Sequence, residues 1–109
     1  MNRITKVVYV DSHCPFTISP KAFLWLREHG SGDLFDCCGN FLLKRHHPLL
    51  VECVETLGDL ANGWICDAQG GVTTCNLEIA EIPGSYYIEN HDGRETVIGL
   101  RDMVRIQRD

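Results

Sequence analysis

Apolar and polar residues follow two periods along this chain, one typical of helices and one typical of strands. The strongest helical pattern lies in residues 45–63, where apolar side chains recur at intervals of three and four residues. These side chains are Leu50, Cys53, Val54, Leu57, Leu60 and Ala61. Pro48 suits a first helical position, because its φ is fixed and no helical hydrogen bond needs its missing N–H. We predict a helix that begins at Pro48 and ends at Asn62-Gly63, where glycine can adopt the left-handed conformation.

A second, shorter helix is predicted from a capping signal. Ser19 precedes Pro20, and a hydroxyl cap followed by proline is typical of a helix start. Apolar residues continue to Leu26, and Gly30 closes the pattern. Residues 31–44 carry glycine, aspartate and asparagine in the proportions of a loop.

The remaining chain is dominated by strand patterns. Residues 3–10 are β-branched and aromatic and predict a first strand, and residues 64–68 predict a short one. Within residues 72–82 the alternation slips by one position at Ile79-Ala80. This slip predicts either a β-bulge or a strand that is covered on both faces.

The C-terminal part predicts a hairpin. Asp92-Gly93 is the strongest turn signal, because both central residues of such a turn favour positive φ. Residues 86–90 and 95–100 would be its two strands, and residues 101–109 could form either a strand or a helix. Together these elements predict one α+β domain over residues 1–109, with an antiparallel β-sheet of about four strands and two helices packed on one face.

Composition and charge limit the possible partners and cellular location of the protein. The net charge is −5, and clustered cations, which nucleic-acid binding requires, are absent, so nucleic acid is an improbable partner. No apolar run approaches the roughly 18 residues of a membrane span, and the start of the chain does not resemble a secretion signal. We therefore expect a cytoplasmic protein whose six cysteines are free thiols. Cys53 and Cys66 are expected to be small core residues.

Catalytic and metal-binding patterns are weak. Cys37-Cys38 and His46-His47 are adjacent pairs, without the spacing that lets two side chains reach one zinc ion. Cysteines and histidines are frequent enough to coincide without forming a nucleophile–base pair, and no phosphate-binding glycine loop is present. We expect no metal, no cofactor and no enzymatic activity.

Two polar clusters remain as candidate binding sites. The first, Arg45-His46-His47, precedes the long helix, where free N–H groups and the helix dipole favour an anion. The second surrounds the predicted hairpin turn. The candidate binding residues are Arg45, His46, Glu89, Asp92, Arg94 and Glu95. A solvated helix start and an ordinary polar turn are the competing explanations. If the protein binds a partner, charge reversal at Arg45 or Glu95 should weaken binding and change stability by no more than about 0.5 kcal/mol, as is usual for exposed side chains.

The same segments carry a resemblance. RHHPLLVECVETLGDLANG, LEIAEIP and YYIENHDGRETV resemble a family of small uncharacterised proteins from bacteria and their phages, with a weaker echo in FTISPKAFLWL. The matching positions are Arg45, His46, Pro48, Ala61, Asn62, Gly63, Glu81, Ile82, Pro83, Glu89, Asp92, Gly93 and Glu95. The chain departs from the family in an apparent insertion at residues 68–75 and in a tail without the family's His, Arg and Trp. The resemblance implies a phage or prophage context and no particular chemistry.

The sequence supports two hypotheses of function. The first is a phage-encoded or prophage-encoded binding protein in the cytoplasm, which inhibits a host or defence protein by docking on it. The alternative is a module that sequesters or senses a small anionic ligand, such as a nucleotide. Self-association stays open under both hypotheses.

Overall fold

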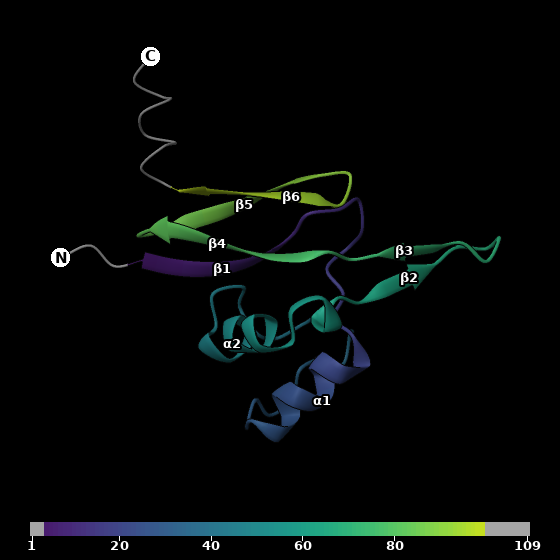
Figure 1. Ribbon diagram of the computed structural model, residues 1–109, viewed down its shortest axis with the longest axis horizontal. Coiled ribbons are helices and arrows are strands. Elements are labelled where there is room, and N and C mark those ends of the chain that lie inside the picture. Colours follow the sequence, from purple (N-terminus) through teal and green to yellow (C-terminus); the bar gives the residue numbers. More distant parts are fainter. Residues whose placement is uncertain (1–3, 100–109) are drawn as a thin grey trace, which may run out of the picture.

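The computed structural model describes residues 4–99, which form two α-helices, one 3-10 helix and six strands (Figure 1). In chain order these are β1 (Ile4–Val10), α1 (Pro20–Glu28), α2 (Pro48–Leu57), η1 (Gly58–Ala61), β2 (Trp64–Cys66), β3 (Val72–Thr74), β4 (Leu77–Pro83), β5 (Tyr86–His91) and β6 (Arg94–Gly99). The α+β class is confirmed. The predicted tail element at residues 101–109 lies outside the described residues.

The six strands pair as three separate two-stranded antiparallel ladders, β1–β4, β2–β3 and β5–β6. This differs from the single sheet of about four strands that the sequence predicts. Two features of the chain account for the difference. Gly84, at φ +88°, turns the chain from β4 into a hairpin that packs over the β1–β4 ladder rather than beside it. Strand β3 leads into β4 through Cys75-Asn76 without reversing direction, so these two strands lie end to end and do not pair (Figure 1).

The β1–β4 ladder is the centre of the molecule. Figure 1 shows the β5–β6 hairpin on one side of this ladder and the helices on the other. Val7 and Val8 are neighbours that point to opposite faces, and both are fully buried. The pairing runs without interruption from Ile4 opposite Pro83 to Val10 opposite Leu77, so there is no bulge. The bulge is therefore wrong as an explanation of the slip at Ile79-Ala80. Ile79 and Ala80 point to opposite faces of β4 and each is partly buried, so the strand is partly covered on both faces.

The helices complete the core beneath this ladder. Helix α1 starts as predicted, because the Ser19 hydroxyl accepts a hydrogen bond from the Ala22 N–H at 3.0 Å. The same hydroxyl donates to the Leu60 carbonyl at 2.6 Å and so joins α1 to η1. The core-facing side chains of α2 are buried as predicted: Leu50, Cys53 and Val54.

Helix α2 ends earlier than the sequence predicts. Gly58 takes φ +57° and stops the helix, and η1 follows, which leaves Leu60 59% exposed rather than in the buried stripe. Gly63 is not a left-handed cap. A Cβ on Gly63 would lie 2.6 Å from the main chain of Thr17, so this position needs glycine because two segments approach closely.

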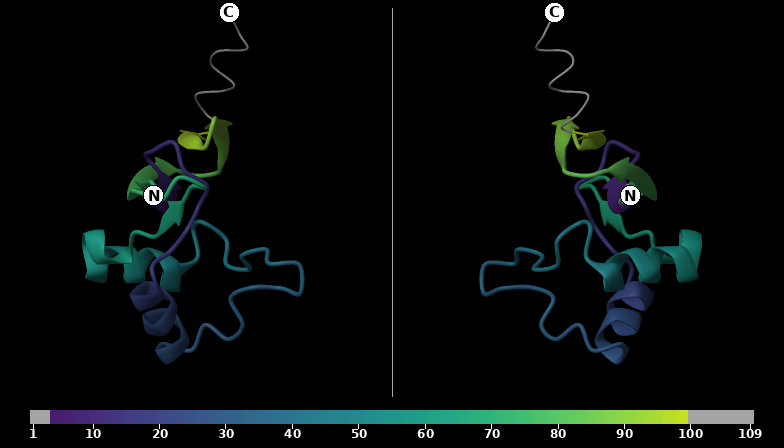
Figure 2. Two further views of the ribbon diagram at one scale, coloured as in Figure 1. Left: turned by 90° about the vertical axis from the view of Figure 1, so that its right-hand side faces the viewer. Right: turned by 90° about the vertical axis from the view of Figure 1, so that its left-hand side faces the viewer.

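Two regions extend from this body. The β2–β3 hairpin projects from one end of the molecule in Figure 1, and residues 31–44 form a long loop that extends sideways in Figure 2. We call residues 64–74 the arm. Phe35 and Phe41 form an isolated antiparallel bridge within the loop.

The cysteines divide evenly between core and surface. Cys14, Cys53 and Cys75 are buried, Cys37, Cys38 and Cys66 are exposed, and all six are free. The prediction for Cys53 is confirmed and that for Cys66 is wrong, because Cys66 lies on the arm.

Candidate functional site

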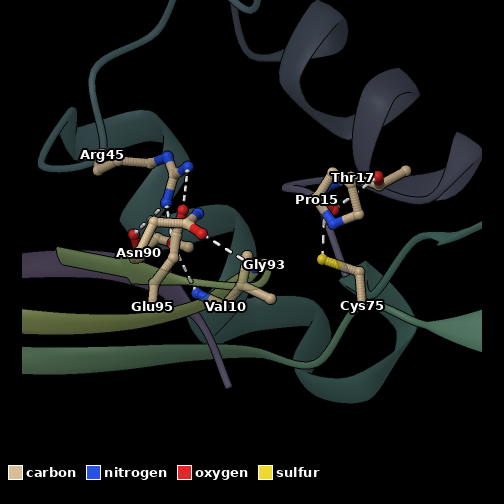
Figure 3. Close-up of polar contacts among 9 residues, drawn as sticks. Val10, Pro15, Thr17, Arg45, Cys75, Asn90, Gly93 and Glu95 are labelled. Carbon is tan, nitrogen blue, oxygen red and sulfur yellow. Dashed lines mark hydrogen bonds and ion pairs between the residues drawn. The ribbon is translucent and has the colours of Figure 1, made fainter. Parts of the chain in front are cut away.

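The two predicted polar clusters meet in an ion pair. Arg45, just before α2, reaches Glu95 on β6 with Nη1–Oε1 and Nη2–Oε2 distances of 2.5 and 2.8 Å. Glu95 is only 7% exposed, and its Oε1 also accepts a hydrogen bond from the Val10 N–H at 2.9 Å (Figure 3). One carboxylate therefore joins β1, β6 and the segment that leads into α2.

Arg45 makes three further contacts that hold it in place. Its guanidinium carbon lies 4.0 Å from the centroid of the Phe16 ring, a cation–π arrangement. Its Nη1 donates to the Val8 carbonyl at 3.3 Å, and its own carbonyl accepts from the Val8 N–H at 2.8 Å. The prediction that Arg45 and Glu95 are exposed charges is wrong. The two residues are 50 positions apart in the chain, so no local sequence pattern indicates that they form a pair.

His46 faces an open groove on the surface. Its Nδ1 lies 2.7 Å from the Tyr86 hydroxyl, and the two rings meet edge to face. The groove has a volume of about 660 Å³, and its lining includes Thr5 and Lys44. Burial raises the pKa of Tyr86, while Arg45 lowers it to a smaller extent, so the hydroxyl stays protonated at neutral pH.

The start of α2 is already capped by its own residues. Pro48 has no N–H, Leu49 donates its N–H to His47 Nδ1 at 3.1 Å, and Val51 donates to the His47 carbonyl at 3.0 Å. The anion hypothesis depends on free N–H groups and on a free Arg45, and both are largely engaged within the chain.

The hairpin tip is tied to the segment that follows β1. Arg94 Nη2 lies 2.9 Å from Asp11 Oδ1 in an exposed ion pair, and the Asp92 carbonyl lies 3.4 Å from His13 Nδ1. A Cβ on Gly93 would lie 2.8 Å from the Cys14 nitrogen. The hairpin tip therefore packs against residues 11–14, the segment that follows β1.

The turn itself has the predicted conformation. Asp92 and Gly93 have φ of +54° and +93°, and the Gly93 N–H donates to Asn90 Oδ1 at 2.9 Å. Glu89 pairs with His91 along the exposed end of β5. These local contacts account for most of the polar residues at the tip, as the explanation of an ordinary polar turn requires.

The arm carries three exposed large apolar side chains, and it was not among the predicted sites. All residues of β2 and β3 are exposed, including Trp64 at 49%, Ile65 at 39% and Val72 at 63%. One signal in the sequence indicates this segment, the short apolar run at residues 64–66.

Metal-binding clusters and membrane-spanning helices concern residues 4–99, the part of the chain that the structure describes. Within this range no three histidine, cysteine, aspartate or glutamate side chains gather closely enough to hold a metal ion. No helix there is both long enough and apolar enough to cross a membrane. Comparison with known proteins found no matching family model, no matching curated protein and no matching solved structure.

Proposed function

We propose that this protein is a small binding module that docks on another protein, and that the arm is the part that docks. The observation that carries the proposal is the exposure of Trp64, Ile65 and Val72 on one projecting hairpin. Trp64 and Val72 lie on one face of this hairpin and Ile65 lies on the other. Apolar side chains that gather at the surface are costly to expose to water and are typical of an interaction site. Tryptophan in particular contributes strongly to protein interfaces.

The likeness to phage and bacterial proteins supplies the biological side of this proposal. A phage-encoded or prophage-encoded inhibitor of a host or defence protein, working in the cytoplasm, needs a compact scaffold and one exposed contact surface. The β1–β4 ladder and its buried ion pair serve as the scaffold, and the arm serves as the contact surface. The polar tip residues Glu89, Asp92 and Arg94 remain accessible for secondary contacts.

The test is a comparison of matched variants in partner capture. Trp64→Ser removes the largest apolar side chain of the arm, which is 49% exposed, and Leu24→Ser removes one from α1 that is 59% exposed. We expect Trp64→Ser to weaken partner binding by about 30-fold, as loss of an interface tryptophan commonly does. Leu24→Ser should bind like the parent. If both variants recover the same proteins in the same amounts, the arm is not the docking surface.

The groove at His46 supports the anionic-ligand alternative. Lys44, His46 and Tyr86 supply a cation, an imidazole and a phenol around one open space. Arg45→Ala and Glu95→Ala cannot separate the hypotheses, because both break the buried ion pair. Lys44→Ala is the appropriate variant, since the Lys44 side chain is exposed. If the alternative is right, a nucleotide stabilises the parent and Trp64→Ser against heating but not Lys44→Ala.

A further inference from the structure

The outer edge of β2 is an unprotected strand edge. Strand edges are usually blunted by charged side chains, proline or bulges, because their free N–H and carbonyl groups pair readily with another strand. Neither β2 (Trp64-Ile65-Cys66) nor β3 (Val72-Thr73-Thr74) contains a charged residue or a proline. This edge therefore has neither charge nor proline to protect it, and only its short length of three residues limits pairing.

The pairing within the arm identifies which groups are free. The bonds from Asp67 N–H to the Gly71 carbonyl and from Cys75 N–H to the Gly63 carbonyl, both 2.9 Å, place the hydrogen-bonded pairs at odd-numbered residues. In an antiparallel ladder the residues between them direct their main-chain groups outward. Trp64 and Cys66 thus direct N–H and carbonyl groups away from β3. Within residues 4–99 no hydrogen bond engages these groups.

The two edges of the arm are not equivalent. On β3, the Thr74 carbonyl accepts a hydrogen bond from the Ser12 hydroxyl at 3.1 Å, so the body of the protein already engages that edge. On β2, the body reaches only as far as Gly63, whose N–H donates to the Thr17 carbonyl at 3.0 Å. Residues 64–66 are the open part of the edge.

We propose that β2 pairs with β2 of a second copy of this chain, antiparallel about a two-fold axis at Ile65. In this register Trp64 lies opposite Cys66 of the second copy, and Cys66 lies opposite its Trp64. Both pairs are of the hydrogen-bonded kind, so the outward groups of the two strands satisfy one another. The result is a four-stranded sheet in the order β3–β2–β2–β3, and the symmetry closes at two copies.

Side chains and charges suit this register. The two Ile65 side chains lie opposite each other at the axis, in the closely spaced kind of pair. Asp67 falls opposite Gly63 of the second copy, so the two carboxylates lie at opposite ends of the new ladder. Each Asp67 carboxylate already accepts hydrogen bonds from Gln69 and Gly71. Pairing therefore brings no two like charges together within the ladder.

The proposed dimer extends the proposed function of the arm, and its biological use rests on that proposed function. Trp64, Cys66 and Val72 occupy one face of the arm, because residues 64 and 66 pair with residues 74 and 72. A dimer joins two such faces into one apolar surface, which is wide enough to receive a partner. Dimerisation itself is measured on the purified protein, so it can fail without any effect on partner capture, and partner capture can fail while the dimer persists.

The decisive experiment exploits the two-fold axis. Sedimentation equilibrium with a thiol reductant present should show a monomer–dimer equilibrium for the parent. Ile65→Glu and Ile65→Lys each place like charges opposite each other, so each should raise the dissociation constant at least about tenfold. An equimolar mixture of the two variants should form a heterodimer. Recovery of dimerisation in the mixture also shows that both variants fold.

A proline pair tests the edge. Cys66→Pro removes an outward N–H of β2 without removing a hydrogen bond inside the arm, and should abolish the dimer. Val72→Pro removes the equivalent outward N–H of β3 and should leave the dimer intact. A parent that stays monomeric up to about 1 mM overturns the proposal and leaves the edge to a strand of another protein. Loss of the dimer in Val72→Pro but not in Cys66→Pro overturns it as well.

Discussion

Glu95 is the residue at which three distant parts of the chain are joined. Its carboxylate binds the Arg45 guanidinium and the Val10 N–H, and the side chain is almost completely buried. A charged group in such a place is stable only while its partners are present. Removing the carboxylate leaves the Val10 N–H, which belongs to a fully buried residue, without an acceptor.

The first prediction follows from this arrangement. Glu95→Ala should lower the free energy of unfolding by about 3 kcal/mol, as expected when one partner of a buried ion pair is removed. Arg94→Ala is the matched control on the same strand, because its pair with Asp11 is exposed and should contribute less than about 1 kcal/mol. Urea denaturation measures both. Equal losses in the two variants would show that burial of Glu95 does not matter.

The second prediction concerns the accessibility of the thiols. In the native protein Cys37, Cys38 and Cys66 should react with a thiol reagent, while the three buried cysteines should react only after unfolding. Mass spectrometry of the labelled, digested protein identifies the modified positions. Rapid modification of Cys53 under native conditions would contradict its burial between α1 and the ladder.

The third prediction is a loss of stability at alkaline pH. Burial raises the pKa of Cys53 and of Cys75 to about 11, against an ordinary value of 9.0. The unfolded chain releases these protons first, so stability is complete below pH 9.0 and falls as pH rises toward about 11. Urea midpoints across this range measure the slope. A Cys53→Ala/Cys75→Ala double variant should show a shallower slope, and an identical slope would assign the effect to other groups.

At the scale of elements, turns are decided by the space around a residue as well as by φ. Gly93 and Gly70 have nearly the same positive φ, +93° and +84°. A side chain on Gly93 would collide with Cys14, whereas nothing lies within 4 Å of a Cβ on Gly70. The β5–β6 turn therefore needs glycine for two reasons and the arm turn for one.

The fourth prediction compares these two turns. Gly70→Ala should cost at most about 1–2 kcal/mol, the strain of an alanine in a left-handed conformation. Gly93→Ala should cost about 1–3 kcal/mol more, because the hairpin must also move away from Cys14. Thermal unfolding ranks the variants. Equal melting temperatures would mean that the tip moves aside freely.

Gly63 shows the same principle at the end of η1. The sequence predicts that Gly63→Val harms the protein through loss of a helix cap. We still expect Gly63→Val to destabilise the protein, but for a different reason. The added side chain would collide with Thr17, whereas the backbone conformation of Gly63 is not strained. Gly58 is the true helix end, and no neighbour packs within 4 Å of its Cβ position.

At the scale of the whole molecule, the arm is separable from the body. Its strands contribute nothing to the buried core, which consists of residues from β1, the helices, β4 and the connecting segments. The fifth prediction is that replacing the whole arm, residues 64–74, with Asn-Gly leaves the fold intact, because Gly63 and Cys75 form the hydrogen-bonded pair that such a turn closes. Stability should change by no more than about 1 kcal/mol. Circular dichroism and urea denaturation measure this change. The shortened protein should neither dimerise nor capture partners, and failure to fold would show that the arm is part of the body.

Local signals were read correctly from the sequence because each depends on a few neighbouring residues. Ser19-Pro20 and Pro48 start helices through their own capping and fixed φ, and Asp92-Gly93 makes its turn through positive φ. The strand at β1 and the α+β class followed from periodicity. The helix end was misplaced, because Gly58 and Asn62-Gly63 are both local stop signals and only their surroundings distinguish them.

What the sequence by itself determined is therefore a set of elements with their inward faces. Only the tertiary structure decided that Arg45 and Glu95 are partners, that β1 lies against β4, and that Cys66 is exposed. Each of these facts depends on where a distant segment of the chain lies. The identity of a charged or apolar residue does not indicate which distant residue it will contact. The candidate site moved for the same reason: burial engaged the predicted charges within the fold and left the apolar arm at the surface.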